Sequence, residues 1–376
     1  MSSKVRNLFG ALALVLASFL VALTVAEGAL RLFPNILPEG AAVRLLWASE
    51  LRESPPSPHP YIGFVPRPQG FAEGEDASDA SAEAIWSQRN LPPWPNSADV
   101  VVVGDSFSYS QTVELDQAWT ALLDEMMPAS RVITLATIGS GPQQYSRVFE
   151  TYGVGLSPKL VLVGLFMGND LYDAEMFDRW QKEAPDQDFR LFRSGEEGSG
   201  ARLWLKKLSE TSYLAALLRD LLRSRGEDKQ LSGKTIELES GERVQIVPRL
   251  LVKSARKAVR GEPEFDLVVD SLSGLHELVK STGSNDLVLL FPSKEEVYGQ
   301  FPGQDPSSLS RPIIDELDRL GIDYLDLGPP LRARAQDGRA LYNEVDGHPN
   351  ELGYDVIAKY VFEYLQANAG RYGLPD

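Results

Sequence analysis

Four consecutive valines, residues 100–103, run directly into Gly104, Asp105 and Ser106. A strand that is apolar at every position is buried on both faces, and such strands lie inside parallel sheets covered by helices. Sites in these sheets form at the carboxyl ends of the strands. The Gly-Asp-Ser sequence is therefore a candidate site, in which Ser106 either acts as a nucleophile or caps the next helix.

Strand and helix patterns alternate along the rest of the chain. Further buried strands are predicted at 131–137, 159–166, 285–292 and 321–327, and helices at 115–127, 142–153, 308–320 and 351–369. Such alternation is typical of a doubly wound parallel sheet. We therefore expect an α/β fold, a three-layer α/β/α sandwich with a parallel, five-stranded, flavodoxin-like sheet, over residues 99–370.

Two segments do not follow this alternation. Residues 175–265 are predicted to be an insertion with an amphipathic helix at 203–225 and a hairpin at 234–247, interpreted as a cap over the edge of the sheet. Residues 28–98 are rich in proline and acidic residues and predict an extended connector, in which His59 is a loop residue.

The N-terminal segment is apolar. Residues 8–26 carry no charge and follow Lys4 and Arg6. At about 1.5 Å per residue this run nearly crosses the ~30 Å bilayer core, and the preceding basic residues favour a cytoplasmic N-terminus. Residues 1–27 therefore predict a single-pass anchor in a bacterial inner membrane, with the remaining chain periplasmic. A signal peptide cleaved after Ala26 is the alternative.

Composition limits the chemistry. The net charge of −16 argues against a nucleic-acid partner. The chain has no cysteine, which excludes disulfides, thiolate metal sites and a cysteine nucleophile. Its three histidines, His59, His276 and His348, are too far apart in the sequence for a metal-ligand spacing, so no metal site is expected.

Four short blocks follow predicted strands or precede the last helix. They are Gly104-Asp105-Ser106, Gly139, Gly168-Asn169-Asp170 and Asp346-Gly347-His348. In order and position these blocks resemble those of the GDSL, or SGNH, hydrolase family. The residues that match the family's serine, glycine, asparagine and histidine are Ser106, Gly139, Asn169 and His348.

The resemblance implies ester cleavage through an acyl-serine intermediate, without a metal or cofactor. Ser106 would be the nucleophile and His348 its general base. The oxyanion hole would use the backbone N–H groups of Ser106 and Gly139 and the side-chain amide of Asn169. Gly141 is an alternative to Gly139.

The acid that orients His348 departs from the commonest pattern of the family. That pattern has an aspartate three residues before the histidine, where this chain has Val345. Asp346 lies two residues before, a spacing that looks like relatives acting on acetyl groups of polysaccharides. Asp346 is the predicted orienting acid, and Glu344 is the alternative. Asp105 and Asp170 are expected to hydrogen-bond loop amides.

The resulting expectation is an extracytoplasmic serine esterase. Its substrate would carry a small acyl ester, an acetyl group on an envelope or exported carbohydrate. One alternative is a carbohydrate O-acetyltransferase on the same fold, which would need a separate membrane partner as acyl donor. The other is a non-catalytic protein for polysaccharide binding or assembly, which would have no need of a serine and histidine pair.

Overall fold

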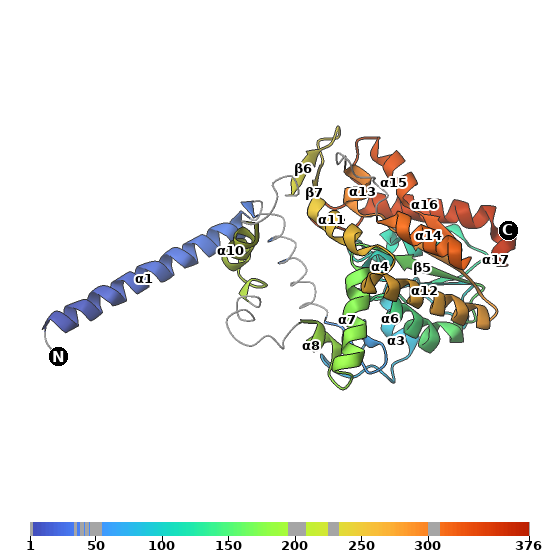
Figure 1. Ribbon diagram of the computed structural model, residues 1–376, viewed down its shortest axis with the longest axis horizontal. Helices are drawn as coiled ribbons and strands as arrows, with labels where there is room; N and C mark the ends of the chain where they lie inside the picture. Colours follow the sequence, from blue (N-terminus) through green and yellow to red (C-terminus); the bar gives the residue numbers. More distant parts are fainter. Residues whose placement is uncertain are drawn as a thin grey trace. The chain divides into compact units, whose positions relative to one another are not determined.

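The computed structural model describes residues 3–33, 36–37, 41, 45, 55–194, 208–224, 233–299 and 309–375 (Figure 1). The chain forms two compact units. One contains residues 1–54 and 195–229. The other contains residues 55–194 and 230–376 and carries the predicted site residues.

A five-stranded sheet forms the centre of the larger unit. Its order is β4-β3-β5-β8-β9, and every neighbouring pair is parallel. The strands are β3 (Val100–Val103), β4 (Val132–Thr134), β5 (Leu160–Leu165), β8 (Asn285–Leu290) and β9 (Tyr324–Asp326). The predicted sheet is thereby confirmed in strand number, direction and flavodoxin-like order.

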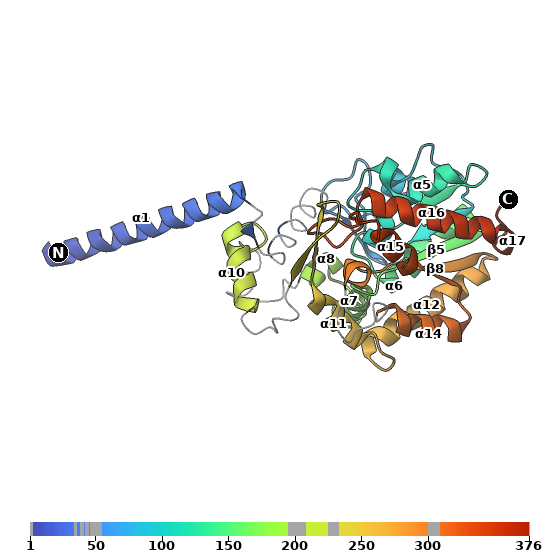
Figure 2. The same ribbon diagram turned by 90° about the horizontal axis from the view of Figure 1, so that it is seen from above.

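The valines of β3 alternate between two cores. Val101 and Val103 pack in one apolar cluster, while Val100 and Val102 pack in the other, and all four are buried. Figure 2 shows β5 and β8 between a layer that contains α5 and α16 and a layer that contains α12 and α14. The first layer holds α5 (Trp119–Met126), α15 (Gly328–Ala335), α16 (Glu351–Ala367) and α17 (Ala369–Tyr372). The second holds α3 (Ala82–Trp86), α6 (Pro142–Val148), α12 (Pro263–Ser281) and α14 (Ser310–Leu320).

The remaining elements of this unit are short or lie near the ends of the strands. They are β1 (Ser57–His59), β2 (Gly63–Val65), α4 (Ser106–Tyr109), α7 (Asp170–Glu183), α8 (Phe189–Ser194), β6 (Lys234–Glu237), β7 (Arg243–Ile246), α11 (Pro248–Lys257) and α13 (Lys294–Tyr298). β1 pairs with β2, and β6 with β7, as antiparallel hairpins. A π-helical turn, Phe149–Gly153, extends α6.

The segment expected to be an extended connector differs from that expectation in its described part, residues 55–98. It forms the β1–β2 hairpin and α3, and Ile62, Val65 and Trp86 are buried in the core. His59 lies in β1 rather than in a loop, and its Nδ1 accepts backbone N–H groups of Tyr61 and Ile62 at 3.2 and 3.1 Å. The apolar residues between the prolines supply enough buried area to fold this segment onto the domain.

The smaller unit joins the N-terminal helix to part of the predicted insertion. It contains α1 (Ser3–Leu32) and α10 (Tyr213–Ser224). Glu27 accepts the backbone N–H groups of Tyr213 and Leu214 at 3.1 and 2.9 Å and so caps α10. The insertion is therefore divided: α10 belongs with α1, whereas β6, β7 and α11 belong to the larger unit. This differs from a single cap.

One helix of the described chain is long and apolar enough to cross a membrane. Its window Leu14–Leu32 has a mean hydropathy of 1.8, and a signal sequence would have the same character. The predicted 203–225 helix is wrong in its described N-terminal part, because residues 209–211 form a turn and α10 begins at Tyr213. Residues 203–207 and 225 lie outside the described residues.

Candidate active site

Ser106 lies where β3 ends and α4 begins. Gly104 makes the turn, and a Cβ built at this position would lie only 2.2 Å from the Ser108 hydroxyl, so a side chain has no room. Asp105 caps α4 by accepting the backbone N–H of Phe107 at 2.9 Å. The predicted capping role thus belongs to Asp105, which leaves the Ser106 side chain available for another contact.

Three sequence-predicted residues form one chain of hydrogen bonds. His348 Nε2 lies 2.7 Å from Ser106 Oγ, and His348 Nδ1 lies 2.5 Å from Asp346 Oδ1. The same carboxylate oxygen accepts the backbone N–H of His348 at 2.7 Å. Ser106, Asp346 and His348 are all at least nine-tenths buried. With a proton on Nδ1, Nε2 is an acceptor aimed at the serine hydroxyl.

Glu344, the alternative acid, points elsewhere. Its carboxylate pairs with Arg243 at 2.8 Å, and its side chain is 38% exposed. Of the two candidate acids, it is Asp346 that hydrogen-bonds the His348 ring.

The other predicted residues lie beside Ser106 at the ends of the neighbouring strands. Gly139 follows β4 with φ of +74°, a left-handed conformation that favours glycine. Asn169 precedes α7, and its Nδ2 group donates to Asp105 at 3.2 Å and to Asp173 at 3.0 Å. The structure thus ties the Asn169 amide to two carboxylates, contacts that the sequence did not indicate. Gly141, the alternative to Gly139, lies against Asp173.

Three buried carboxyl groups, Asp105, Asp170 and Asp173, influence one another's charge, and Asp105 and Asp173 both accept the Asn169 amide. Burial raises the pKa of Asp105 to about 6, although the hydrogen bond from the Phe107 N–H and the nearby His348 both lower it. Burial, reinforced by the charge of Asp105, raises the pKa of Asp170 well above its ordinary value. Asp170 accepts the Phe166 N–H at 2.7 Å, which confirms the expected bond to a loop amide, whereas the amide that Asp105 accepts, that of Phe107, lies in α4.

Asp173 gives folding stability a predictable pH dependence. Burial, assisted by Asp105, raises the pKa of Asp173 to about 7, although Arg193 opposes this shift. The folded state then holds a proton that the unfolded chain releases near its ordinary pKa of about 4. This contribution is complete below pH ~4 and is lost as the pH rises through ~7.

We expect Asp173→Asn, which removes this titration, to flatten the decrease in stability between pH 5 and 8. The measurement is the urea midpoint of the detergent-solubilised chain at several pH values. Asp178→Asn is the control, because Asp178 lies on the same helix in an exposed pair with Lys182. An unchanged slope in the Asp173 variant would contradict the assignment.

Lys294, on α13, supports the loop that carries Asp346 and His348. Its side chain is buried, and its ammonium donates to the carbonyls of Val345 at 2.8 Å, Asp346 at 3.2 Å and Glu344 at 3.4 Å. Sequence reasoning missed this residue because Lys294 lies 50 positions from Glu344, and no local pattern connects the two. A charged donor with three backbone acceptors holds the loop in one conformation.

Replacing Lys294 by methionine is expected to destabilise the fold by about 2–3 kcal/mol, because buried carbonyls lose a charged donor. Turnover is expected to fall as well, since His348 loses its support. Chemical denaturation checks the first effect. Lys182→Met is the matched control, for its exposed pair with Asp178 predicts a loss below about 1 kcal/mol. Equal losses in both variants would argue against the loop-clamp role.

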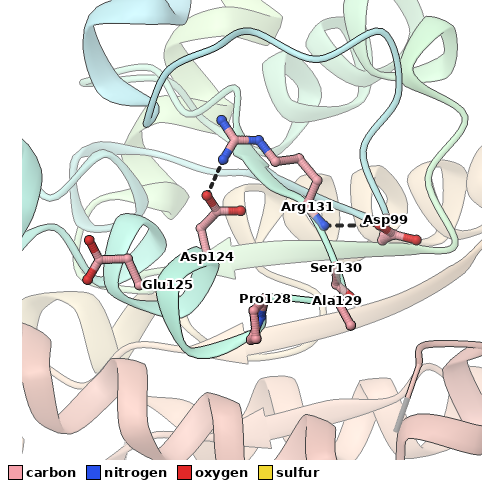
Figure 3. Close-up of a pocket in the computed structure, with 7 residues that line it drawn as sticks. All are labelled: Asp99, Asp124, Glu125, Pro128, Ala129, Ser130 and Arg131. Carbon is pink, nitrogen blue, oxygen red and sulfur yellow. Dashed lines mark hydrogen bonds and ion pairs between the residues drawn. The ribbon is translucent and has the colours of Figure 1, made fainter.

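A pocket elsewhere in the larger unit does not adjoin these residues. It is lined by Asp99, Asp124, Glu125, Pro128, Ala129, Ser130 and Arg131 (Figure 3). Asp99 and Arg131 directly precede β3 and β4, so the pocket lies at the amino ends of the strands, opposite Ser106. Arg131 is already engaged by Asp124, as the dashed line in the figure marks.

Comparisons with known proteins find remote likenesses in solved structures. A lipolytic protein of the G-D-S-L family from Veillonella parvula is 12% identical, with 71% of this chain and 97% of that chain covered and a TM-score of 0.38. The acetyl xylan esterase AlAXEase is 10% identical, with 71% and 99% covered and a TM-score of 0.38. TesA is 14% identical, with 71% and 98% covered and the same TM-score.

No other comparison adds to these likenesses. No family model matches the sequence, and no curated protein matches it either. The solved structures that it resembles are lipolytic G-D-S-L proteins and acetylxylan esterases. Because these likenesses are remote, the function rests on the side chains of this chain.

Proposed function

We propose that this chain is a serine esterase that hydrolyses small acyl esters by way of an acyl-serine intermediate. The observation that carries the proposal is the continuous chain from Ser106 Oγ through both ring nitrogens of His348 to Asp346. A nucleophile, a base and an orienting acid at these distances have the arrangement that activates a serine hydroxyl.

The acylation step follows from this arrangement. Ser106 Oγ attacks the ester carbonyl carbon while its proton passes to His348 Nε2, 2.7 Å away. The carbonyl electron pair moves to oxygen and is stabilised by the proposed donors, the backbone N–H groups of Ser106 and Gly139 and the Asn169 amide. The intermediate then collapses, and the leaving alcohol takes the proton from Nε2.

Deacylation repeats these steps with water. His348 Nε2 takes a proton from water as its oxygen attacks the acyl carbon, and then returns a proton to Ser106 Oγ as the carboxylic acid leaves. Asp346 stabilises the imidazolium in both halves of the reaction and holds the proton on Nδ1. To donate to the oxyanion, the Asn169 amide must give up its hydrogen bond to Asp105 or to Asp173.

The proposed substrate is an acetyl ester on an envelope or exported carbohydrate. The Asp-Gly-His spacing supports this class through the resemblance to enzymes of polysaccharide acetylation. The apolar helix α1 supports an inner-membrane anchor, with Lys4 and Arg6 on the cytoplasmic side and the larger unit in the periplasm.

The test is the release of acetate from acetylated oligosaccharides by the detergent-solubilised chain. Acetate release that is absent in Ser106→Ala would support the esterase and its substrate class. Turnover of 4-nitrophenyl acetate without release from sugars would retain the esterase and reject the carbohydrate. If neither substrate is hydrolysed but a fluorophosphonate labels Ser106, the O-acetyltransferase alternative would be favoured, and no labelling would favour a non-catalytic role.

A further inference from the structure

Arg193, the penultimate residue of α8, contacts the carbonyl of one residue proposed for the oxyanion hole, Gly139, and the carboxylate that holds another, Asn169. One guanidinium nitrogen, Nη1, donates to the Gly139 carbonyl, and the other, Nη2, lies 2.7 Å from Asp173 Oδ1. The second oxygen of Asp173 accepts the Asn169 amide at 3.0 Å. Arg193 is therefore bonded directly to the Gly139 carbonyl and, through one carboxylate, to Asn169.

The network continues to the nucleophile. The Asn169 amide also donates to Asp105 Oδ2 at 3.2 Å, and Asp105 Oδ1 accepts the Phe107 N–H at 2.9 Å at the start of α4. Ser106 is the residue between Asp105 and Phe107. The ends of β3, β4 and β5, which bear the three proposed oxyanion groups, are thus connected by one series of hydrogen bonds that begins at Arg193.

The surroundings of α8 hold Arg193 in place. Phe189 packs against Trp180 and Phe177 of α7, with ring centroids 5.1 and 5.2 Å apart. Asp173 is 1% exposed, so its pair with Arg193 is little screened on the carboxylate side. A planar guanidinium presents two separate nitrogens to a carbonyl and a carboxylate in a fixed geometry, which the single nitrogen of a lysine does not reproduce.

We propose that Arg193 is a positioning residue of the oxyanion hole, which fixes Gly139 through its carbonyl and Asn169 through Asp173. This inference rests on the proposed serine esterase and extends it to a residue outside the four blocks of the family resemblance. Arg193 does not touch the reacting atoms. It acts by holding in place the two residues, Gly139 and Asn169, whose donors serve the developing oxyanion.

The inference predicts a change in turnover rather than in ground-state binding. Arg193→Gln is expected to lower kcat for 4-nitrophenyl acetate by about 10- to 100-fold and to change KM by less than about threefold, because a displaced donor loses stabilisation only in the transition state. Arg193→Lys should retain part of the activity. Because the Arg193 side chain is 26% exposed, added methylguanidinium should partly restore Arg193→Ala, while an equal concentration of sodium chloride should not.

Arg190→Gln is the matched control. Arg190 lies on the same helix, pairs with Asp188 and donates to the Pro56 carbonyl. The full-length wild type, Ser106→Ala and these variants are assayed together in the same detergent, and thermal melts are recorded for each.

Each outcome has one meaning. A selective loss of kcat in Arg193→Gln, together with rescue of Arg193→Ala by methylguanidinium, supports the positioning role. Wild-type kcat in Arg193→Gln, or equal losses in Arg190→Gln and Arg193→Gln, overturns it while leaving the esterase intact. A wild type no more active than Ser106→Ala overturns the proposed function and this inference with it.

Discussion

Ser106→Ala is expected to lower kcat/KM for 4-nitrophenyl acetate by about 10⁴-fold or more, since it removes the atom that forms the acyl intermediate. His348→Ala should cause a loss of similar size, because the serine hydroxyl then loses the base that lies within hydrogen-bond distance. The double variant should be little worse than either single variant, as the two residues act as one unit. Initial rates of nitrophenolate release measure all three.

Ser108→Ala is the matched control for the serine substitution. Ser108 is buried on the same helix, and its hydroxyl has no hydrogen-bond partner among the described residues, so its removal should leave both folding and kcat near wild type. Retention of activity in well-folded Ser106→Ala would reject the acyl-serine mechanism. Additive losses in the double variant would indicate that Ser106 and His348 act separately.

The central sheet could be predicted because each strand carries its own signal. The valines of β3 and the apolar run of β5 are buried on both faces, and a continuous apolar run followed by glycine or asparagine marks both the strand and its end. The carboxyl ends of parallel strands share one edge, so Ser106, Gly139 and Asn169 could be grouped before any coordinates were known.

The support around these residues could not be predicted, because it depends on contacts between distant segments. Arg193 is 54 residues from Gly139, and Lys294 is 52 from Asp346. Both look like ordinary surface cations on short amphipathic helices. The burial of Asp173 is likewise a tertiary effect, since the sequence of α7 gives an aspartate in the first turn a simple capping explanation. The sequence of residues 55–98 predicts a connector because its many prolines obscure scattered core residues such as Trp86.

Asp346→Asn is expected to lower kcat by about 10²- to 10⁴-fold, because an amide no longer stabilises the imidazolium and can favour the wrong tautomer of His348. The carboxylate holds the His348 ring at 2.5 Å and the backbone N–H of the same residue at 2.7 Å, so one oxygen sets both the tautomer and the loop. An asparagine that turns its NH₂ group toward Nδ1 would force the ring proton onto Nε2. Nε2 could then no longer accept the proton of the Ser106 hydroxyl.

Glu344→Gln tests the competing acid with the same change of charge. Glu344 pairs with Arg243 at the surface, so its substitution should alter kcat by less than about twofold. The two variants therefore distinguish Asp346 from Glu344 as the acid that orients His348. A large loss in Glu344→Gln with normal turnover in Asp346→Asn would assign the orienting role to Glu344, and would mean that this loop rearranges when substrate binds. The opposite result would establish that an aspartate two residues before the histidine orients it, in a loop that Lys294 holds through the carbonyls of Val345 and Asp346.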